Sequence, residues 1–446
     1  MIESLLHRGK YVDDTTIEGE RRADGIAPAH ANGLQVSRNR FLLTVSMLNF
    51  RGVDDNTSAI WQLREGSYDG PVVKEGVLVK SIDDWYPLGD TYRCVRQYGH
   101  PVVLGVPKGA VVRGRRAVNE NVFAVAWRTC GRVFVPTSER VGGYLMWFNE
   151  PKEVRRGTQC VEWAQFRLAD DENDIEFIQP PMQLRQVGYE DGEQVCPHPG
   201  VMNQSYVAPV AVNDDATEWA MVNTLSTEDR PACVAALRLR YDAKRGRYDY
   251  VQTGPLSDPG LFEGNISRYG DSFVLNARRA ERKPGVAWAR VSDPFTEKPA
   301  FTLDESVGNG SSPLSAYRAA DGVIRLLSGD ERCSQHRYNR DPIFLWDIDP
   351  DNNFAASNRR SVYSPRSEGT RIPHEHGPIA DMAKLLPHAG GRIQKLIHRV
   401  RTCAMAVKEA DYGGPPHQLT EDDFIDTAVY HADMTYTEEQ PASWRF

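Results

Sequence analysis

The strongest constraint on the fold is a long succession of short apolar segments, each ended by Gly, Pro, Asp or Asn. Examples are residues 41–48, 72–80, 122–127 and 343–347. Runs of this length, alternating or wholly apolar and bounded by turn residues, predict β-strands. About two dozen such strands without long helices between them indicate an all-β protein, which is a propeller, a large barrel or tandem sandwiches. Four strands per blade fit best, so we expect a β-propeller of about five or six blades, with six favoured.

Composition limits the classes of partner. The 446 residues carry a formal net charge of -8, which argues against nucleic acid because that partner needs a basic surface. The first ten residues lack the apolar core of a secretion signal, and no run is long enough to span a bilayer. We therefore expect a soluble protein without a membrane partner, whose compartment and oligomeric state stay undetermined. Seven dispersed cysteines without a C-x-x-C pair favour reduced thiols.

The predicted division of the chain has three parts. Residues 1–40 are expected to form an N-terminal extension and closing segment, and residues 41–410 the β-propeller catalytic domain. Residues 411–446 begin with a Pro/Gly-rich, acidic stretch, and we expect them to be a C-terminal tail that packs on the propeller.

Residues 260–279 predict a β-hairpin with a glutamate and an arginine at its open end. Tyr269, Gly270 and Asp271 form the expected turn, and apolar residues alternate on both sides of it. Residues placed symmetrically about a turn lie near each other in an antiparallel pair. Glu263 and Arg278 are therefore expected side by side, where the alternative to a functional role is an ordinary surface ion pair.

This segment resembles the central segment of the sialidase superfamily. The shared pattern is a glutamate, an apolar strand, a Gly-Asp turn, a second apolar strand and Asn-x-Arg, here Asn276 to Arg278. The resemblance implies a sialidase-like propeller in which Glu263 assists catalysis and Arg278 is one of three arginines that bind the substrate carboxylate. The implied activity is that of an exo-acting glycoside hydrolase removing an acidic or deoxy sugar from a glycan or polysaccharide.

The same resemblance implies two further arginines and an aspartate acid/base. Arg51 follows the first strong strand, and Arg340 precedes the strand at 343–347, so these two are the candidates for substrate binding. Asp55 is the candidate acid/base, although Asp54 and other nearby aspartates remain open. Each arginine also has an acidic neighbour with which it could form a local ion pair.

The sequence departs from the family where the catalytic tyrosine is expected. The corresponding segment contains His374 and His376, which share one face if the segment is extended. These histidines are candidates for general acid–base catalysis, with a structural role or metal ligation as alternatives. His100, from another predicted blade, is a candidate for binding a sugar hydroxyl or protonating a leaving group.

Two other functions remain open. A polysaccharide lyase acting on uronates would use a histidine and a tyrosine to move the C5 proton, for which His100, Tyr206 and Tyr269 are available. Tyr269 is also a candidate substrate-binding residue of the hydrolase. A non-catalytic propeller that binds carbohydrate or protein is the third class, because propellers host many unrelated functions.

Oxygen donors stand at alternate positions in Asp347, Asp349 and Asp351. This spacing is that of a calcium loop, but the glycine and the terminal glutamate of such a loop are missing. We expect an inter-strand loop with at most weak structural calcium binding, and otherwise no cofactor.

Overall fold

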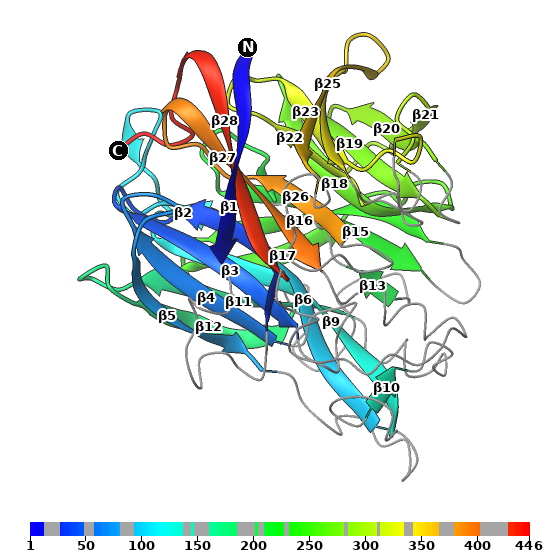
Figure 1. The fold of residues 1–446 in the computed structure, drawn as a ribbon. Helices are drawn as coiled ribbons and strands as arrows, with labels where there is room; N and C mark the ends of the chain where they lie inside the picture. Colours follow the sequence, from blue (N-terminus) through cyan, green and yellow to red (C-terminus); the bar gives the residue numbers. More distant parts are fainter. Residues whose placement is uncertain are drawn as a thin grey trace.

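The computed structural model describes residues 1–12, 27–48, 58–80, 93–136, 144–146, 160–184, 201–203, 209–226, 232–280, 284–309, 313–333, 342–364, 379–401 and 427–446. This part of the chain forms 28 β-strands and contains no α-helix (Figure 1). Accordingly, these residues include no helix that could cross a membrane. The all-β prediction is confirmed.

The first three blades are antiparallel sheets that follow one another along the chain. Blade 1 consists of β2 (Ala27–Gln35), β3 (Arg40–Leu48), β4 (Ser58–Glu65) and β5 (Val72–Val79). Blade 2 consists of β6 (Arg93–Val106), β9 (Val122–Pro136), β10 (Tyr144–Met146), β11 (Cys160–Leu168) and β12 (Ile175–Gln183), with the small hairpin β7 (Val111–Val112) and β8 (Arg115–Arg116) between β6 and β9. Blade 3 consists of β13 (Val201–Asn203), β14 (Val210–Ala211), β15 (Glu218–Ser226), β16 (Cys233–Asp242) and β17 (Arg247–Thr253).

Three further sheets complete the ring. Blade 4 consists of β18 (Leu261–Tyr269), β19 (Ser272–Arg279), β20 (Val286–Val291) and β21 (Thr302–Asp304). Blade 5 consists of β22 (Ser315–Arg318), β23 (Ile324–Ser328), β24 (Ile343–Asp349) and β25 (Ala355–Tyr363). Blade 6 consists of β26 (Ile379–Leu385), β27 (Gly391–Arg401), β28 (Ala428–Gln440) and, from the other end of the chain, β1 (Ile2–Val12).

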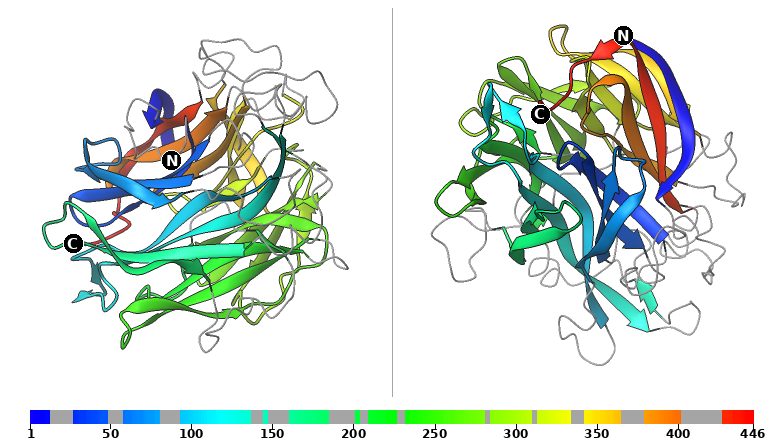
Figure 2. Two further views of the ribbon diagram at one scale, coloured as in Figure 1. Left: turned by 90° about the horizontal axis from the view of Figure 1, so that it is seen from below. Right: turned by 90° about the vertical axis from the view of Figure 1, so that its left-hand side faces the viewer.

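Blade 6 joins the two ends of the described chain. β1 pairs antiparallel with β28, with Leu5 opposite Met434, and the blue and red ribbons run side by side in Figure 1 and in the right-hand view of Figure 2. Because β1 is the fourth strand of this sheet, the ring closes with six blades. The predicted six-bladed propeller is confirmed, whereas the predicted boundaries at 40/41 and 410/411 remain a prediction.

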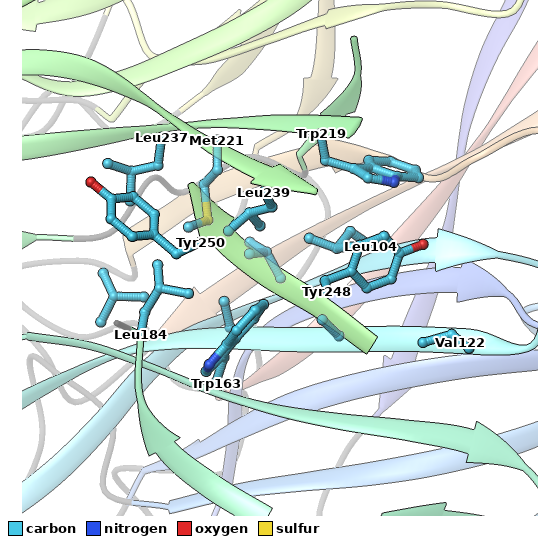
Figure 3. Packing of buried hydrophobic residues seen from close by; sticks show 14 of the residues in the cluster. Leu104, Val122, Trp163, Leu184, Trp219, Met221, Leu237, Leu239, Tyr248 and Tyr250 are labelled. Atoms are coloured by element: carbon cyan, nitrogen blue, oxygen red, sulfur yellow. The ribbon is translucent and has the colours of Figure 1, made fainter. Parts of the chain in front are cut away.

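Closure of the ring is also visible in the hydrophobic core. Six clusters of buried apolar residues each draw their members from two successive blades, and the last cluster joins blade 6 to blade 1. Between blades 2 and 3, for example, Trp163 and Leu104 pack with Trp219, Tyr248 and other residues (Figure 3). Every blade is therefore held by apolar contacts with both neighbours.

Strands inside a blade are buried on both faces. Seven of the eight residues of β4 are buried, among them the polar residues Ser58, Gln62 and Arg64. The outer strand β25 is mostly exposed and correspondingly polar. The first strands of neighbouring blades contact one another, as do β2 and β6, β18 and β22, and β22 and β26, so these strands form the inner wall of the ring.

Candidate active site

Four of the six inner strands carry a β-bulge. In each bulge, two residues of the inner strand lie opposite one residue of the second strand. The four pairs are Ala29-His30 opposite Ser46, His100-Pro101 opposite Trp127, Glu263-Gly264 opposite Ala277, and Met382-Ala383 opposite His398. Bulges re-aim side chains and are common beside active sites. The bulges place His30, His100 and Glu263 at one level of the ring, in blades 1, 2 and 4.

Three bulge residues have a left-handed backbone. The φ angles are 56° for His100, 53° for Glu263 and 55° for Met382. This region is uncommon for residues other than glycine and costs about 1–3 kcal/mol each, so it persists only where the surrounding structure enforces it. The inner wall therefore holds strained backbone at corresponding positions of three blades.

Glu263 and Arg278 form the ion pair that the hairpin pattern predicted. β18 and β19 are joined by the two-residue turn Gly270-Asp271, with Gly270 at a φ of 58°. At the other end of the hairpin, Nη1 of Arg278 donates to Oε2 of Glu263 at 2.7 Å. The arginine side chain is 5% exposed and the glutamate side chain 14% exposed. The pair is thus largely buried, with its carboxylate the more accessible partner.

Neighbouring groups hold this pair in place. The guanidinium of Arg278 lies over the ring of Phe262, with its carbon 4.8 Å from the ring centroid. The backbone N–H of Glu263 donates to Oγ1 of Thr224, in blade 3, at 2.7 Å. The next residue is Gly264, where a Cβ atom would lie 2.6 Å from Cγ1 of Val222. The glycine lets blade 4 approach blade 3 closely at this point.

His100 is buried rather than presented at the surface. Its ring contacts that of His30 from blade 1, with 3.9 Å between the ring centroids and an angle of 51° between the ring planes. Burial is the main reason that the pKa of His100 lies well below its ordinary value. The positive charges of Arg128, Arg399 and Lys384 lower this pKa further. The imidazole of His100 is therefore neutral at physiological pH, which limits it to hydrogen bonding and proton acceptance.

Sequence reasoning missed two arginines equivalent to Arg278. Each stands opposite the residue that precedes a bulge: Arg128 opposite Gly99, Arg278 opposite Phe262, and Arg399 opposite Asp381. They occur in blades 2, 4 and 6, and all three are buried. The signal in the sequence is an arginine at the end of an apolar second strand. That the three arginines occupy the same register becomes recognisable only from the strand pairing.

Arg399 makes its own acid–arginine pair. Its Nη2 donates to Oδ2 of Asp381 at 3.2 Å, its Nε to Oδ1 of the same carboxylate, and its Nη1 contacts Nε2 of His30. The Asp381 side chain has no exposed surface. This second pair is therefore enclosed between blades 6 and 1, in contrast to Glu263–Arg278.

Tyr269 lies away from the Glu263–Arg278 pair. Tyr269 is the last residue of β18 and Glu263 is the third, so six residues of β-strand, or roughly 20 Å, separate them. Its hydroxyl donates to Oδ2 of Asp351 at 2.7 Å, and the guanidinium of Arg290 lies over its ring. The hydrogen bond with Asp351 raises the pKa of Tyr269. The structure thus corrects the expectation that Tyr269 would join Glu263 in binding a substrate, because it links blades 4 and 5 at the opposite end of the hairpin.

Several predicted site residues lie outside the described part of the chain. These are Arg51, Asp55, Arg340, His374 and His376, together with Tyr206. Their proposed roles remain predictions.

Two aspartates of the calcium-loop-like sequence, Asp347 and Asp351, bind basic and polar side chains. Asp347 accepts hydrogen bonds from Nε of Arg325 at 2.9 Å and from the side-chain amide of Asn358 at 3.0 Å. Asp351 binds Arg290 at 2.6 Å in addition to Tyr269. Within the described ranges, no three His, Cys, Asp or Glu side chains gather as metal ligands. The geometry of this loop therefore gives no support to a calcium site.

The closed ring, its six blades and the inner-wall bulges define a β-propeller of sialidase-like fold, as the sequence resemblance implied. No protein-family model matches the sequence, and no curated protein matches it either. Solved structures do match.

A protein of unknown function from Dyadobacter fermentans aligns over 98% of this chain and 98% of its own, with 11% identity and a TM-score of 0.52. The intramolecular trans-sialidase from Ruminococcus gnavus aligns over 98% of both chains, with 9% identity and a TM-score of 0.53. A mutant of Trypanosoma rangeli sialidase displaying trans-sialidase activity aligns over 97% of this chain and 58% of its own, with 11% identity and a TM-score of 0.53. At these identities the similarity shows the shared fold.

Proposed function

We propose that this protein is a glycoside hydrolase that removes a carboxylate-bearing sugar from the end of a glycan or polysaccharide. The observation that carries the proposal is the Glu263–Arg278 pair, in which a strained glutamate binds a buried arginine at 2.7 Å on the inner wall of the propeller. An ion pair of purely structural value would not need a left-handed glutamate.

Arg278 is the proposed receptor for the ligand carboxylate. A guanidinium presents its donors in a planar fork that matches a carboxylate, and such charge-assisted bonds are about twice as strong as neutral ones. Glu263 on one side and Phe262 on the other fix the orientation of this fork before a ligand arrives. The arginine therefore loses little conformational freedom on binding.

Glu263 is the proposed catalytic carboxylate. Hydrolysis breaks the bond between the anomeric carbon and the leaving oxygen, adds water to the sugar and transfers a proton to the leaving group. Glu263 is placed to take a proton from the group that attacks the anomeric carbon, while Asp55, His374 and His376 are the proposed proton donors. The bond to Arg278 keeps Glu263 oriented for this step.

The similar structures support the class of substrate. Two of them are described as a sialidase mutant displaying trans-sialidase activity and an intramolecular trans-sialidase. This likeness, together with a buried arginine that can receive a carboxylate, favours an acidic sugar over a neutral one.

The lyase alternative fits the geometry less well. It needs a histidine and a tyrosine close to one carbon atom of the substrate. His100 is buried in the bulge of β6, in blade 2, whereas Tyr269 lies at the end of β18, in blade 4, and is bound to Asp351. These two side chains are therefore not positioned to share a proton transfer.

The test is product release from a panel of acidic glycans and polysaccharides, read by mass spectrometry. The wild type is compared with Glu263→Gln and with Glu305→Gln, a matched change at an exposed glutamate. We expect a hydrated monosaccharide that Glu263→Gln abolishes and Glu305→Gln leaves unchanged. An unsaturated product, lighter by one water, would instead indicate a lyase. Binding of a glycan without any product would indicate the non-catalytic propeller.

A further inference from the structure

Lys384 is a buried cation without a partner. It lies on the inner strand β26, directly after the bulge of blade 6, and is 1% exposed. Within the described part of the chain, its Nζ atom forms no hydrogen bond or ion pair. A buried ammonium group is normally paired, since an unpaired charge loses its hydration without compensation.

The surroundings of Lys384 are rich in cations. The charge of Arg399 lowers the pKa of Lys384, and the charges of both residues lower the pKa of His100. Arg128 from blade 2 acts on the same imidazole. Among the described groups that affect His100, one carboxylate, Asp381, opposes these three cations.

That carboxylate is already engaged. Both oxygens of Asp381 accept hydrogen bonds from Arg399. The pair neutralises Arg399, and the Nζ atom of Lys384 has no hydrogen-bond partner among the described residues. In the low-dielectric space between blades 6, 1 and 2, the unpaired ammonium group of Lys384 attracts an anion strongly.

We propose that Lys384, together with Arg399, Arg128 and the adjacent imidazoles of His30 and His100, binds a small inorganic anion of the chloride class. These five side chains are at most 8% exposed, which favours a small, single-atom anion. The proposal makes no use of Glu263 or Arg278, which carry the proposed hydrolase function, so either proposal can fail without the other.

Anion binding is coupled to the protonation of Lys384. The groups that face the site are His30 on β2, His100 on β6, Arg128 on β9, Asp381 on β26 and Arg399 on β27. An anion favours the ammonium form of Lys384, so binding takes up a proton and strengthens as the pH falls towards 6.

Thermal unfolding in different sodium salts tests the proposal. At one ionic strength, we expect chloride and bromide to raise the melting temperature by several degrees relative to gluconate, and more at pH 6 than at pH 8. Lys384→Met is expected to lose this difference, while Lys298→Met, a change at an exposed lysine, keeps it. Equal melting temperatures in all salts, a rise in acetate alone, or a halide effect that survives in Lys384→Met would each overturn the proposal.

A second measurement uses only the wild-type protein. In crystals grown with sodium bromide, we expect an anomalous-scattering peak within about 3.5 Å of Nζ of Lys384. Crystals that show the side chain clearly but no such peak would refute the site, whether or not Lys384→Met folds.

Discussion

Arg278 and Arg399 occupy the same position in two different blades, and each binds a carboxylate from the inner strand of its own blade. The two pairs differ in accessibility. Asp381 has no exposed surface, whereas Glu263 is 14% exposed. The difference arises because Asp381 precedes its bulge and stays in the regular ladder, while Glu263 is the bulge residue itself. The same combination of a bulge and an arginine on the second strand thus gives an enclosed pair in blade 6 and an accessible pair in blade 4.

Substitutions at the accessible pair should separate catalysis from binding. Glu263→Gln is expected to lower kcat by about 100-fold or more, the scale of general acid–base catalysis. Arg278→Lys should mainly raise KM for an acidic substrate, because an ammonium group cannot reproduce the planar fork. Steady-state kinetics on the best substrate of the panel measure both. Arg279→Lys is the matched control at the neighbouring, partly exposed arginine. Unchanged kinetics in both variants would contradict the assigned roles.

The close approach of blades 3 and 4 should be essential for the placement of Glu263. Gly264→Ala puts a methyl group 2.6 Å from Cγ1 of Val222, so we expect a loss of about 1–3 kcal/mol in the free energy of unfolding. Urea unfolding measures this loss. Adding Val222→Ala removes the clashing methyl groups and is expected to restore part of the activity lost in Gly264→Ala. No recovery in the double variant would show that the glycine acts in some other way.

The enclosed pair should be coupled to Lys384. Asp381→Asn leaves Arg399 and Lys384 buried without a carboxylate, and we expect a loss of about 3–5 kcal/mol in stability. Lys384→Met in the same background removes one of the two cations, so the double variant should be more stable than Asp381→Asn alone. A double-mutant cycle measured by urea unfolding gives the interaction energy. Strict additivity would mean that the two groups do not interact.

The fold was predictable because its signals are local. Apolar runs ended by turn residues mark each strand, and the Gly270-Asp271 turn fixes the register that brings Glu263 to Arg278. The corresponding bulge positions of the different blades could not be recognised in the sequence, because a bulge constrains the backbone and the available volume and does not require one residue type. The first bulge positions hold four different residue types, in Ala29, His100, Glu263 and Met382.

The candidate site was predictable only in part. Tyr269 belongs to the same predicted hairpin as Glu263, but the length of β18 separates the two side chains. His100 was identified as a polar group of another blade, yet its burial and its contact with His30 depend on how blades 1 and 2 pack. Contacts between blades, such as the Arg399–His30 contact across 369 positions, leave no local sequence pattern.

Calcium should not affect stability. The carboxylates of Asp347 and Asp351 are held by Arg325, Arg290 and Tyr269, so binding a cation would first require breaking these bonds. We expect the melting temperature to change by less than about 1 °C on adding millimolar calcium chloride or EDTA, with magnesium chloride as the control for chloride and ionic strength. A calcium-specific rise of several degrees that Asp349→Asn abolishes would contradict this prediction.

The stability of the propeller should depend on pH through Lys384. Burial, and then the charge of Arg399, lower the pKa of Lys384 from 10.5 to about 7. Between these two values the unfolded chain binds a proton that the folded protein does not, so the free energy of unfolding rises with pH, by at most about 1.4 kcal/mol per pH unit. Below about pH 7 both states are protonated and this dependence ends.

Lys384→Met should remove this slope. We expect the difference in unfolding free energy between wild type and Lys384→Met to grow in favour of wild type from pH 7 to pH 9 in halide-free gluconate buffer, measured by urea unfolding. Lys298→Met should follow the wild-type profile, since its ammonium group is exposed. Parallel profiles for wild type and Lys384→Met would mean that Lys384 keeps its ordinary pKa in the folded protein. Repeating the series in chloride should move the rise to higher pH, because a bound anion holds the lysine in its charged form.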